Sequence, residues 1–295
     1  MNKPLPRSIQ EYLEQLREQL TGADPALIQD ALYDAEEYLR GEMHQHPDKS
    51  EEQILAAIAS TYGAPDEVAE AYRETELKVQ AALRTPKPRK RVSLLGRFFS
   101  VLADAHTYTA LFYMLLALFT GIFYFTWVVA GIALSFGLSS LIIGIPFFLL
   151  FLGSVRLLSL VEGRIVETFL GVRMPRRPPY TGGTQRLFTR IKELLVDGRT
   201  WSTLCYMVLQ LPLGILYFTI VISWLAVSLA LILSPLSHIW GSLIYFNGPV
   251  VISWLFEPLL VVIGILMLIG LMHFARGIAA LHGHIAKALL VRVTD

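Results

Sequence analysis

Four long apolar stretches beyond residue 83 set what this chain can fold into. They cover about residues 109–132, 138–155, 203–232 and 256–275. Each has roughly 17 residues or more, which as a helix crosses the ~30 Å hydrocarbon core of a bilayer. Because 54% of the 295 residues are also hydrophobic, the sequence predicts an all-α membrane protein with four spans.

Positive charge is confined to one side of these spans. All 18 Lys and Arg beyond residue 83 fall before the first span, between the second and third, or after the fourth. By the positive-inside rule, both termini and the 156–202 loop are predicted to be cytoplasmic. The first residues, "MNKPLPRSIQEYLEQL", lack the apolar core of a signal peptide, which agrees with an N-terminus that stays on the side of synthesis.

The charge balance divides the chain into an acidic head and a basic body. The first 83 residues carry 7 Lys and Arg against 17 Asp and Glu, whereas the remainder carries 18 against 7. Such asymmetry bears on partners and surfaces rather than on fold. The predicted domains are a cytoplasmic head at 1–83, a basic proline-containing linker at 84–92, membrane repeat 1 at 93–180 and membrane repeat 2 at 181–295.

An internal repeat organises the body. Residues 107–126 and 200–219 are identical at 11 of 20 positions at an offset of 93, and the ends of the second spans correspond at an offset of 120. Each copy has two spans, so both enter from the same side and the repeats are parallel. An amphipathic stretch precedes each copy and is predicted to lie in the membrane interface. The two copies are expected to pack face to face.

The repeated residues define a candidate ligand or packing face. The two tyrosines of each copy are 11 residues apart, or three helical turns, and a glycine close to them lets a neighbouring helix approach. One interpretation is helix packing with aromatic anchoring near the interface; the other is an aromatic-lined pocket between the copies. The residues are Tyr113, Gly121 and Tyr124, with their counterparts Tyr206, Gly214 and Tyr217.

Signatures of transport or catalysis are sparse. The spans hold no Asp, Glu, Lys or Arg near their centres, which disfavours an ion pump or coupled transporter. No Walker, Rossmann or HExxH pattern occurs. His44 and His46 lie on different helix faces without a third ligand, which favours solvated surface over a metal site. We expect no enzyme activity, no catalytic or metal site and no cofactor.

The head reads as a bundle of short helices that folds alone. Residues 6–20 and 25–45 place apolar side chains at steps near 3.6, typical of amphipathic helices. Three carboxylates, Asp34, Glu36 and Glu37, form either a solvated face or a partner-docking surface. Further boundary signals are a capping box at Ser50 and Gln53, a helix stop at Gly63 and a helix start at Pro65.

The head resembles the HAAS domain, a small helical signalling module found in bacteria beside PadR-type helix-turn-helix regulators. This resemblance implies a regulatory module without enzymatic chemistry, whose partner is a PadR-type regulator, so that the chain itself does not contact nucleic acid. The oligomeric state stays open, with a homo-oligomer among the alternatives. The residues that carry the resemblance are Tyr12, Leu13, Leu16, Leu20, Asp34, Glu37, Gly63, Pro65 and Ala69.

The body resembles the sensor domain of bacterial membrane proteins, which often stands ahead of histidine kinases. Its closing stretch reads "LVEGRIVETFLGVRMP", and copy two departs from it by placing His282 where copy one has Glu162. The resemblance implies an inner-membrane sensory protein whose output passes through the head. A transporter-like or lipid-handling permease subunit and a membrane scaffold are the alternatives. The residues that carry the motif are Glu162, Arg164, Leu170, Gly171, Val172 and Pro175.

Overall fold

A computed structural model describes residues 6–83, 94–139, 143–177, 196–236 and 254–291. Within these ranges every regular element is a helix, in agreement with the predicted all-α class. Four helices are long and apolar enough to cross a membrane, namely α6 (Ala105–Gly137), α7 (Gly144–Leu170), α9 (Gly198–Ile232) and α11 (Glu257–Leu290).

The chain forms two compact units. The first unit contains the head together with α7 and the chain segment that follows α7. The second unit contains α6 and most of α9 and α11. Their bounds are Met1–Arg84, Leu138–Thr203 and Ala286–Asp295 for the first, and Thr85–Gly137 and Leu204–Ile285 for the second.

The head is built from four helices. Serine or aspartate side chains accept backbone N–H bonds at the starts of three of them, and Ser50 with Gln53 forms the predicted capping box. The helix start at Pro65 is as predicted, and Gly63 just before it has a positive φ of 107°. The preceding helix ends at Ile58, earlier than the predicted stop at Gly63, because residues 59–62 already form turns. The helices are α1 (Ile9–Gln19), α2 (Pro25–Gln45), α3 (Glu51–Ile58) and α4 (Pro65–Leu83).

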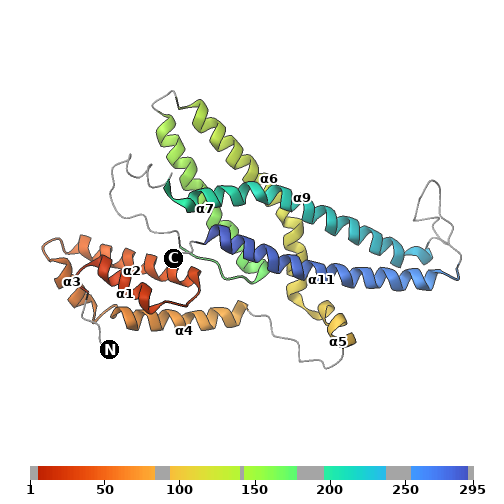
Figure 1. The fold of residues 1–295 in the computed structure, drawn as a ribbon, viewed down its shortest axis with the longest axis horizontal. Coiled ribbons are helices and arrows are strands. Elements are labelled where there is room, and N and C mark those ends of the chain that lie inside the picture. Colours follow the sequence, from red (N-terminus) through yellow and green to blue (C-terminus); the bar gives the residue numbers. More distant parts are fainter. Residues whose placement is uncertain (1–5, 84–93, 140–142, 178–195, 237–253, 292–295) are drawn as a thin grey trace. The chain divides into compact units, whose positions relative to one another are not determined.

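An apolar core lies between these helices, with α1 packed against α2 and α4 (Figure 1). The hydroxyl of Tyr12 donates to the carbonyl of Gly63 at 2.9 Å, which ties α1 to the turn before α4. Tyr38 stacks on Tyr62 with ring centroids 4.4 Å apart. The fully or nearly buried core residues include Leu16, Leu20, Leu27, Ala31, Leu39, Ile54, Leu55, Ile58 and Ala69.

Helix α7 differs from the span predicted at 138–155. It begins at Gly144, so that Pro146 falls in its first turn, where a missing N–H costs little. It continues to Leu170 because the charged residues beyond 155 fit a helix as well as the apolar ones do. Gly171 then ends it in the left-handed conformation (φ 66°), a common glycine cap.

The second unit begins with α5 (Leu94–Phe99) and the short 3-10 helix η1 (Ser100–Ala103), where an interfacial helix is predicted. Asp104 separates η1 from α6 and caps α6 by accepting from the His106 N–H and the Thr107 hydroxyl. It also forms an ion pair with Arg276 of α11. Most of the second predicted interfacial helix, at 186–201, lies outside the described residues.

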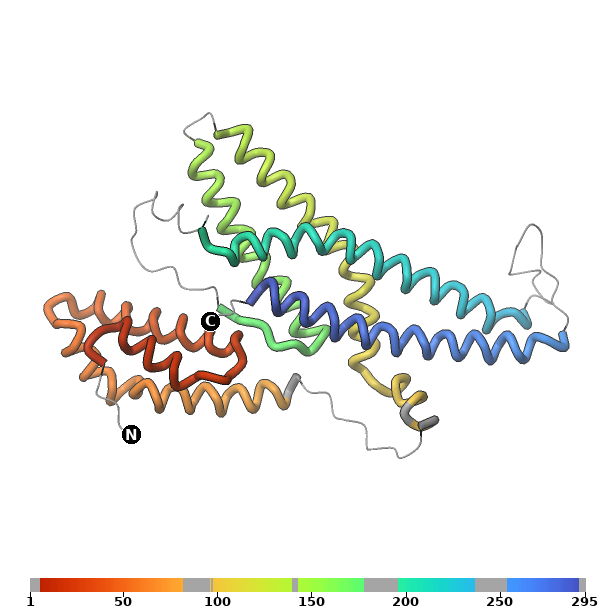
Figure 2. The backbone as a smooth tube through the Cα atoms, in the orientation of Figure 1, coloured from red at the N-terminus to blue at the C-terminus, as the bar shows by residue number. Residues whose placement is uncertain are grey.

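Helices α9 and α11 run side by side in this unit (Figure 2). The indole of Trp224 donates to the carbonyl of Met267 at 2.9 Å. Gly264 sits against the backbone of Ser228, where a Cβ would lie 2.8 Å from the carbonyl oxygen. A small residue is therefore needed at this contact, as is usual where membrane helices pack closely. Another 3-10 helix, η2 (Ser234–Leu236), follows α9.

Candidate functional site

One candidate site is a buried polar cluster in the second unit, which we call the tyrosine–histidine cluster. At its centre lies His282 of α11, whose side chain has no solvent exposure. Tyr113 of α6 and Tyr206 of α9 place their hydroxyls 2.6 and 3.0 Å from His282 Nε2. Tyr217 of α9 places its hydroxyl 3.2 Å from Nδ1. Three helices thus converge on one imidazole.

Gln210 extends the cluster. Its Nε2 donates to the Tyr113 hydroxyl at 3.3 Å, and its side chain is fully buried. A neutral imidazole has one donor and one acceptor nitrogen, and each phenol can donate or accept, so the tyrosine hydroxyls can satisfy both ring nitrogens of His282. Such satisfaction matters in a membrane, because a polar group without a partner in an apolar medium costs several kcal/mol.

The two glycines of the predicted face lie where α6 crosses α9. A Cβ on Gly121 would come within 2.7 Å of the Gln210 carbonyl oxygen, and one on Gly214 within 2.3 Å of the Ala117 carbonyl oxygen. Both obstacles are backbone, so no side-chain rotation would relieve them. The contact is also reciprocal in register, because Ala117 and Gln210 are counterparts at the offset of 93.

The structure therefore brings five of the six residues of the predicted face into two adjoining contacts, the glycine crossing and the hydrogen bonds to His282. Tyr124, the sixth, is buried in α6 as well. Sequence reasoning missed His282 as a member of the site, because the fourth span was predicted to end at 275. The helix runs on to Leu290. The sequence did contain a signal for this residue, because His282 stands at the position that corresponds to Glu162 in the first copy.

A second candidate site lies in the first unit, which we call the Arg173 cluster. Arg173 follows α7 by three residues, and its Nη2 donates to Asp30 Oδ2 of α2 at 3.0 Å. Its Nε donates to Glu76 Oε2 of α4 at 3.1 Å, and Nη1 lies 3.7 Å from Glu167 of α7. All four side chains are under 9% exposed. One arginine thus joins the head to the end of α7.

The backbone after Arg173 is held by the head as well. The second carboxylate oxygen of Asp30, Oδ1, accepts the N–H groups of Arg176 and Arg177 at 2.7 and 2.9 Å. Gln29 donates to the carbonyl of Arg177 at 2.6 Å. Pro175 restricts this stretch, because proline fixes its own φ and disfavours helix in the residue before it. The segment 171–177 therefore meets α2 as non-helical chain.

Burial and ion pairing oppose each other at this cluster. Burial raises the pKa of Asp30 above its usual value, although the Arg176 and Arg177 N–H groups and Arg173 act to lower it. Burial acts to lower the pKa of Arg173, yet its bonds to Glu76 and Asp30 outweigh this and raise it. The arginine therefore stays charged, whereas Asp30 bears the cost of desolvation.

The predicted docking face, Asp34, Glu36 and Glu37, is divided in the structure. Asp34 accepts from the Tyr72 hydroxyl at 2.9 Å and pairs with Arg177 at 2.9 Å. Glu36 pairs with Arg40 one turn along α2, while Glu37 is exposed. Sequence reasoning missed Asp30, Glu76 and Arg173. An acidic residue on the apolar face of the 25–45 helix was the available signal for Asp30.

Other polar contacts of the first unit reach the same side of the head. Lys287, near the end of α11, pairs with Asp24 at 2.5 Å. Arg199, in the first turn of α9, donates to the Gln29 side chain at 2.8 Å. Short pieces of α9 and α11 therefore also hold the head, and each contact uses a basic residue of the body against an acidic or amide group of the head.

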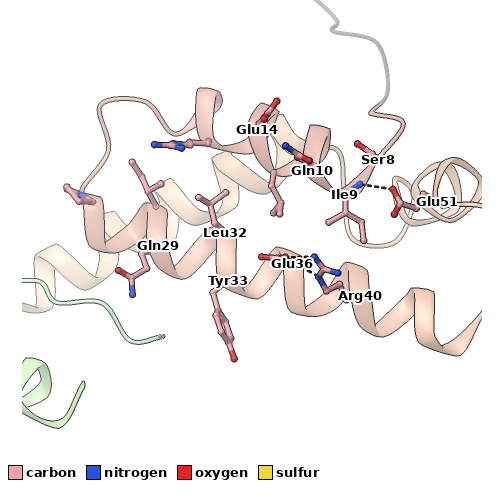
Figure 3. A pocket seen from close by; sticks show the side chains of 14 residues that line it. Ser8, Ile9, Gln10, Glu14, Gln29, Leu32, Tyr33, Glu36, Arg40 and Glu51 are labelled. Carbon is pink, nitrogen blue, oxygen red and sulfur yellow. Dashed lines mark hydrogen bonds and ion pairs between the residues drawn. The ribbon is translucent and has the colours of Figure 1, made fainter. Parts of the chain in front are cut away.

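A groove of about 650 Å³ lies between α1 and α2 (Figure 3). Apolar side chains such as Leu13, Ile28 and Leu32 line it, with Glu14 and the Glu36–Arg40 pair at its edge. Gln29 and Tyr33 belong both to this groove and to the contacts with Arg177. Among the described residues, no three His, Cys, Asp or Glu side chains are grouped to hold a metal ion.

These features define a multi-pass helical membrane protein with a helical head. The family described as "Putative sensor" matches residues 113–290, more than half of the chain, and the chain belongs to this family. The match includes both His282 and Arg173 but not the head. Comparison with curated proteins and with solved structures gives no match.

Proposed function

We propose that this chain is an inner-membrane sensory protein, in which the body detects a cue from the membrane or a hydrophobic small molecule and the head relays it. The observation that carries this proposal is the Arg173 cluster. An arginine of the sensor-family region is buried among carboxylates of the head, so a rearrangement of α7 would act directly on the head. The proposed action is regulatory rather than enzymatic.

The tyrosine–histidine cluster is the proposed cue-responsive element of the body. Hydrogen bonds between membrane helices contribute about 0.6 kcal/mol on average, so a small difference in affinity for two packings can shift their populations. Both first-span helices supply tyrosines to His282 and exchange glycine contacts, which supports the proposal that the body arose as two parallel repeats.

The head is proposed to be a HAAS-type module whose partner is a PadR-type regulator, with the head, both termini and loop 156–202 in the cytoplasm. The confinement of Lys and Arg to one side of the spans supports this orientation. Cysteine labelling at Thr85 and Ser237, in a background that lacks Cys205, tests it. Only the cysteine at 237 is expected to react with an impermeant reagent applied outside; labelling at 85 alone would reverse the orientation.

The function is tested with the full chain in nanodiscs, by measuring amide hydrogen exchange of residues 171–177 while the acyl-chain length is varied and hydrophobic compounds are added. We expect at least one condition to change exchange there, and expect the change to be lost in His282→Gln. His284→Gln is the matched control, because His284 is exposed on the same helix. Unchanged exchange under every condition, together with solute flux in proteoliposomes, would replace the sensor by a transporter.

A further inference from the structure

We infer that the head carries a recognition site for an extended peptide with two arginines four residues apart, and that residues 171–177 of the same chain occupy it. The occupied site is closed to a partner that presents a similar peptide. The inference deepens the proposed function and rests on it for the relay step, because a partner could bind only after the body has withdrawn its own segment.

The first arginine is read by two helices of the head. Arg173 directs separate nitrogens at Asp30 on α2 and Glu76 on α4, at 3.0 and 3.1 Å. A guanidinium presents its donors in a rigid planar fork, whereas a lysine offers a single point charge. The site therefore selects arginine, and burial of both carboxylates below 9% exposure makes this the most enclosed part of the contact.

The backbone of the peptide is read next. Asp30 uses its other oxygen to accept two successive N–H groups, and Gln29 donates to the carbonyl of Arg177. Asp30 therefore recognises both the Arg173 side chain and the backbone N–H groups of Arg176 and Arg177. These backbone contacts need a non-helical segment, which Pro175 favours. A helical peptide with the same charges could not present these groups in the same way.

The second arginine is read at the edge of the site. Arg177 Nε lies 2.9 Å from Asp34 Oδ1, and its guanidinium carbon lies 5.7 Å from the centre of the Tyr33 ring. By contrast, Arg176 points to Glu167 of α7, outside the head. The head therefore binds the side chains of Arg173 and Arg177, whereas α7 of the body binds the side chain of Arg176.

The segment is suited to release. It follows the left-handed Gly171, contains no regular element, and leaves Arg177 half exposed. Because desolvation offsets much of the attraction in buried ion pairs, the closed state can be favoured and still open readily. Attachment in cis supplies a high effective concentration, and a partner peptide must compete with it. The partner's chemistry is therefore an extended, proline-containing, doubly arginine-bearing segment.

The test uses the full chain in nanodiscs and a fluorescein-labelled peptide with the sequence of residues 171–179, GVRMPRRPP. Its binding is followed by fluorescence anisotropy. Wild type is expected to bind weakly, and Arg173→Gln, which weakens the internal segment, at least about tenfold more tightly. Adding Asp30→Asn to Arg173→Gln should abolish binding. Arg7→Gln, a change at an exposed arginine that pairs with Glu52, is the matched control and should behave as wild type.

A control peptide with glutamine in place of Arg173 and Arg177 should not bind. Equal binding of the two peptides to Arg173→Gln, or no binding of either, would overturn the recognition site. A second test uses wild type and so does not depend on whether the variant folds. Excess peptide should compete with the internal segment and speed amide exchange at Arg176 and Arg177. If it does not, the inference is wrong. These assays contain no cue, so a negative result would contradict the recognition site and leave the proposed sensory function untested by it. Peptide binding in a chain that responds to no cue would contradict the sensory function and leave the recognition site standing.

Discussion

The tyrosine–histidine cluster and the Arg173 cluster solve the same problem with opposite chemistry. Each buries polar side chains around one nitrogen-bearing residue, from two helices around His282 and from three around Arg173. In the membrane body, hydroxyls and an amide surround His282, with glycine contacts on the neighbouring helix crossing. At the head, three carboxylates surround Arg173. The neutral cluster is ordered by shape and hydrogen bonds, and the charged one by ion pairs.

The difference follows from the solvent of each region. A charge inside hydrocarbon is expensive, so the spans rely on close backbone approach and neutral groups. A junction at the water side can bring ions together, and is then sensitive to the loss of any one of them, because the remaining charges are left uncompensated. The two clusters should therefore fail differently: the junction when a charge is lost, the body when a side chain is too large.

The largest effect is expected for Arg173→Met, which leaves Asp30, Glu76 and Glu167 together without their arginine. Breaking a buried ion pair in this way costs about 3–5 kcal/mol. The head should detach from residues 171–177, and amide exchange at Arg176 and Arg177 should rise by roughly 100-fold or more. Arg7→Met, at an ion pair with Glu52 that is exposed at both ends, should cost under about 1 kcal/mol. Equal effects of both variants would erase the contrast between the clusters.

Next in size is Gly214→Leu. Even a Cβ at this position would lie 2.3 Å from the Ala117 carbonyl oxygen, so a leucine must force α6 and α9 apart. We expect a loss of about 3 kcal/mol, the upper part of the usual range for overpacking. Unfolding in detergent, followed by tryptophan fluorescence, measures it. Gly153→Leu is the control, because nothing lies within 4 Å of that glycine, and it should change stability by under about 0.5 kcal/mol.

A smaller effect is expected for single hydroxyls of the body. Tyr113→Phe removes a hydroxyl that contacts both His282 and Gln210, and should cost roughly 1 kcal/mol, within the range measured for hydrogen bonds in membranes. A double-mutant cycle with His282→Gln should show coupling of similar size. Tyr108→Phe, at an exposed tyrosine, should show no coupling to His282→Gln. If the effects of Tyr113→Phe and His282→Gln simply add, the hydrogen bond between these residues does not stabilise the body, and close packing alone orders it.

The smallest effect concerns pH at the junction. Burial raises the pKa of Asp30 above 3.8, so the closed junction takes up a proton more readily than an open one. This contribution is complete below the ordinary pKa and is lost as pH rises through the raised value. Acidification from pH 7 to 5 should therefore slow corrected exchange at Arg176 and Arg177 slightly, under about tenfold. Asp30→Asn should abolish the dependence, and faster exchange at pH 5 would contradict it.

Local features of the fold were predictable, and long-range ones were not. The bounds of α2, the Ser50–Gln53 capping box and the helix start at Pro65 follow from neighbouring residues. The Asp30 contact with Arg173 joins positions 143 residues apart, and no periodicity reports such a pair. The repeat did point to the tyrosines and glycines of the body, because two copies of one pattern single out the residues they share.

His282 shows where that reasoning stopped. The fourth span was expected to end at about residue 275, so His282 was treated as a departure from the closing motif and not as part of the site. Length was the deciding quantity, because α11 is 34 residues long and ends at Leu290. Arg173 was likewise counted among the positive charges that orient the spans. A residue counted only for its charge was in fact buried in an ion cluster.

The reciprocal glycine contact carries a consequence for symmetry. Gly121 meets Gln210, Gly214 meets Ala117, and the two pairs exchange under the offset of 93, as a two-fold axis would require. A single copy could satisfy the same contact by pairing with an identical chain. Such a homodimer would be bound to place the same residue at corresponding sites. Two corresponding stretches of a single chain are free of that rule, and at corresponding positions this chain holds Glu162 in one stretch and His282 in the other.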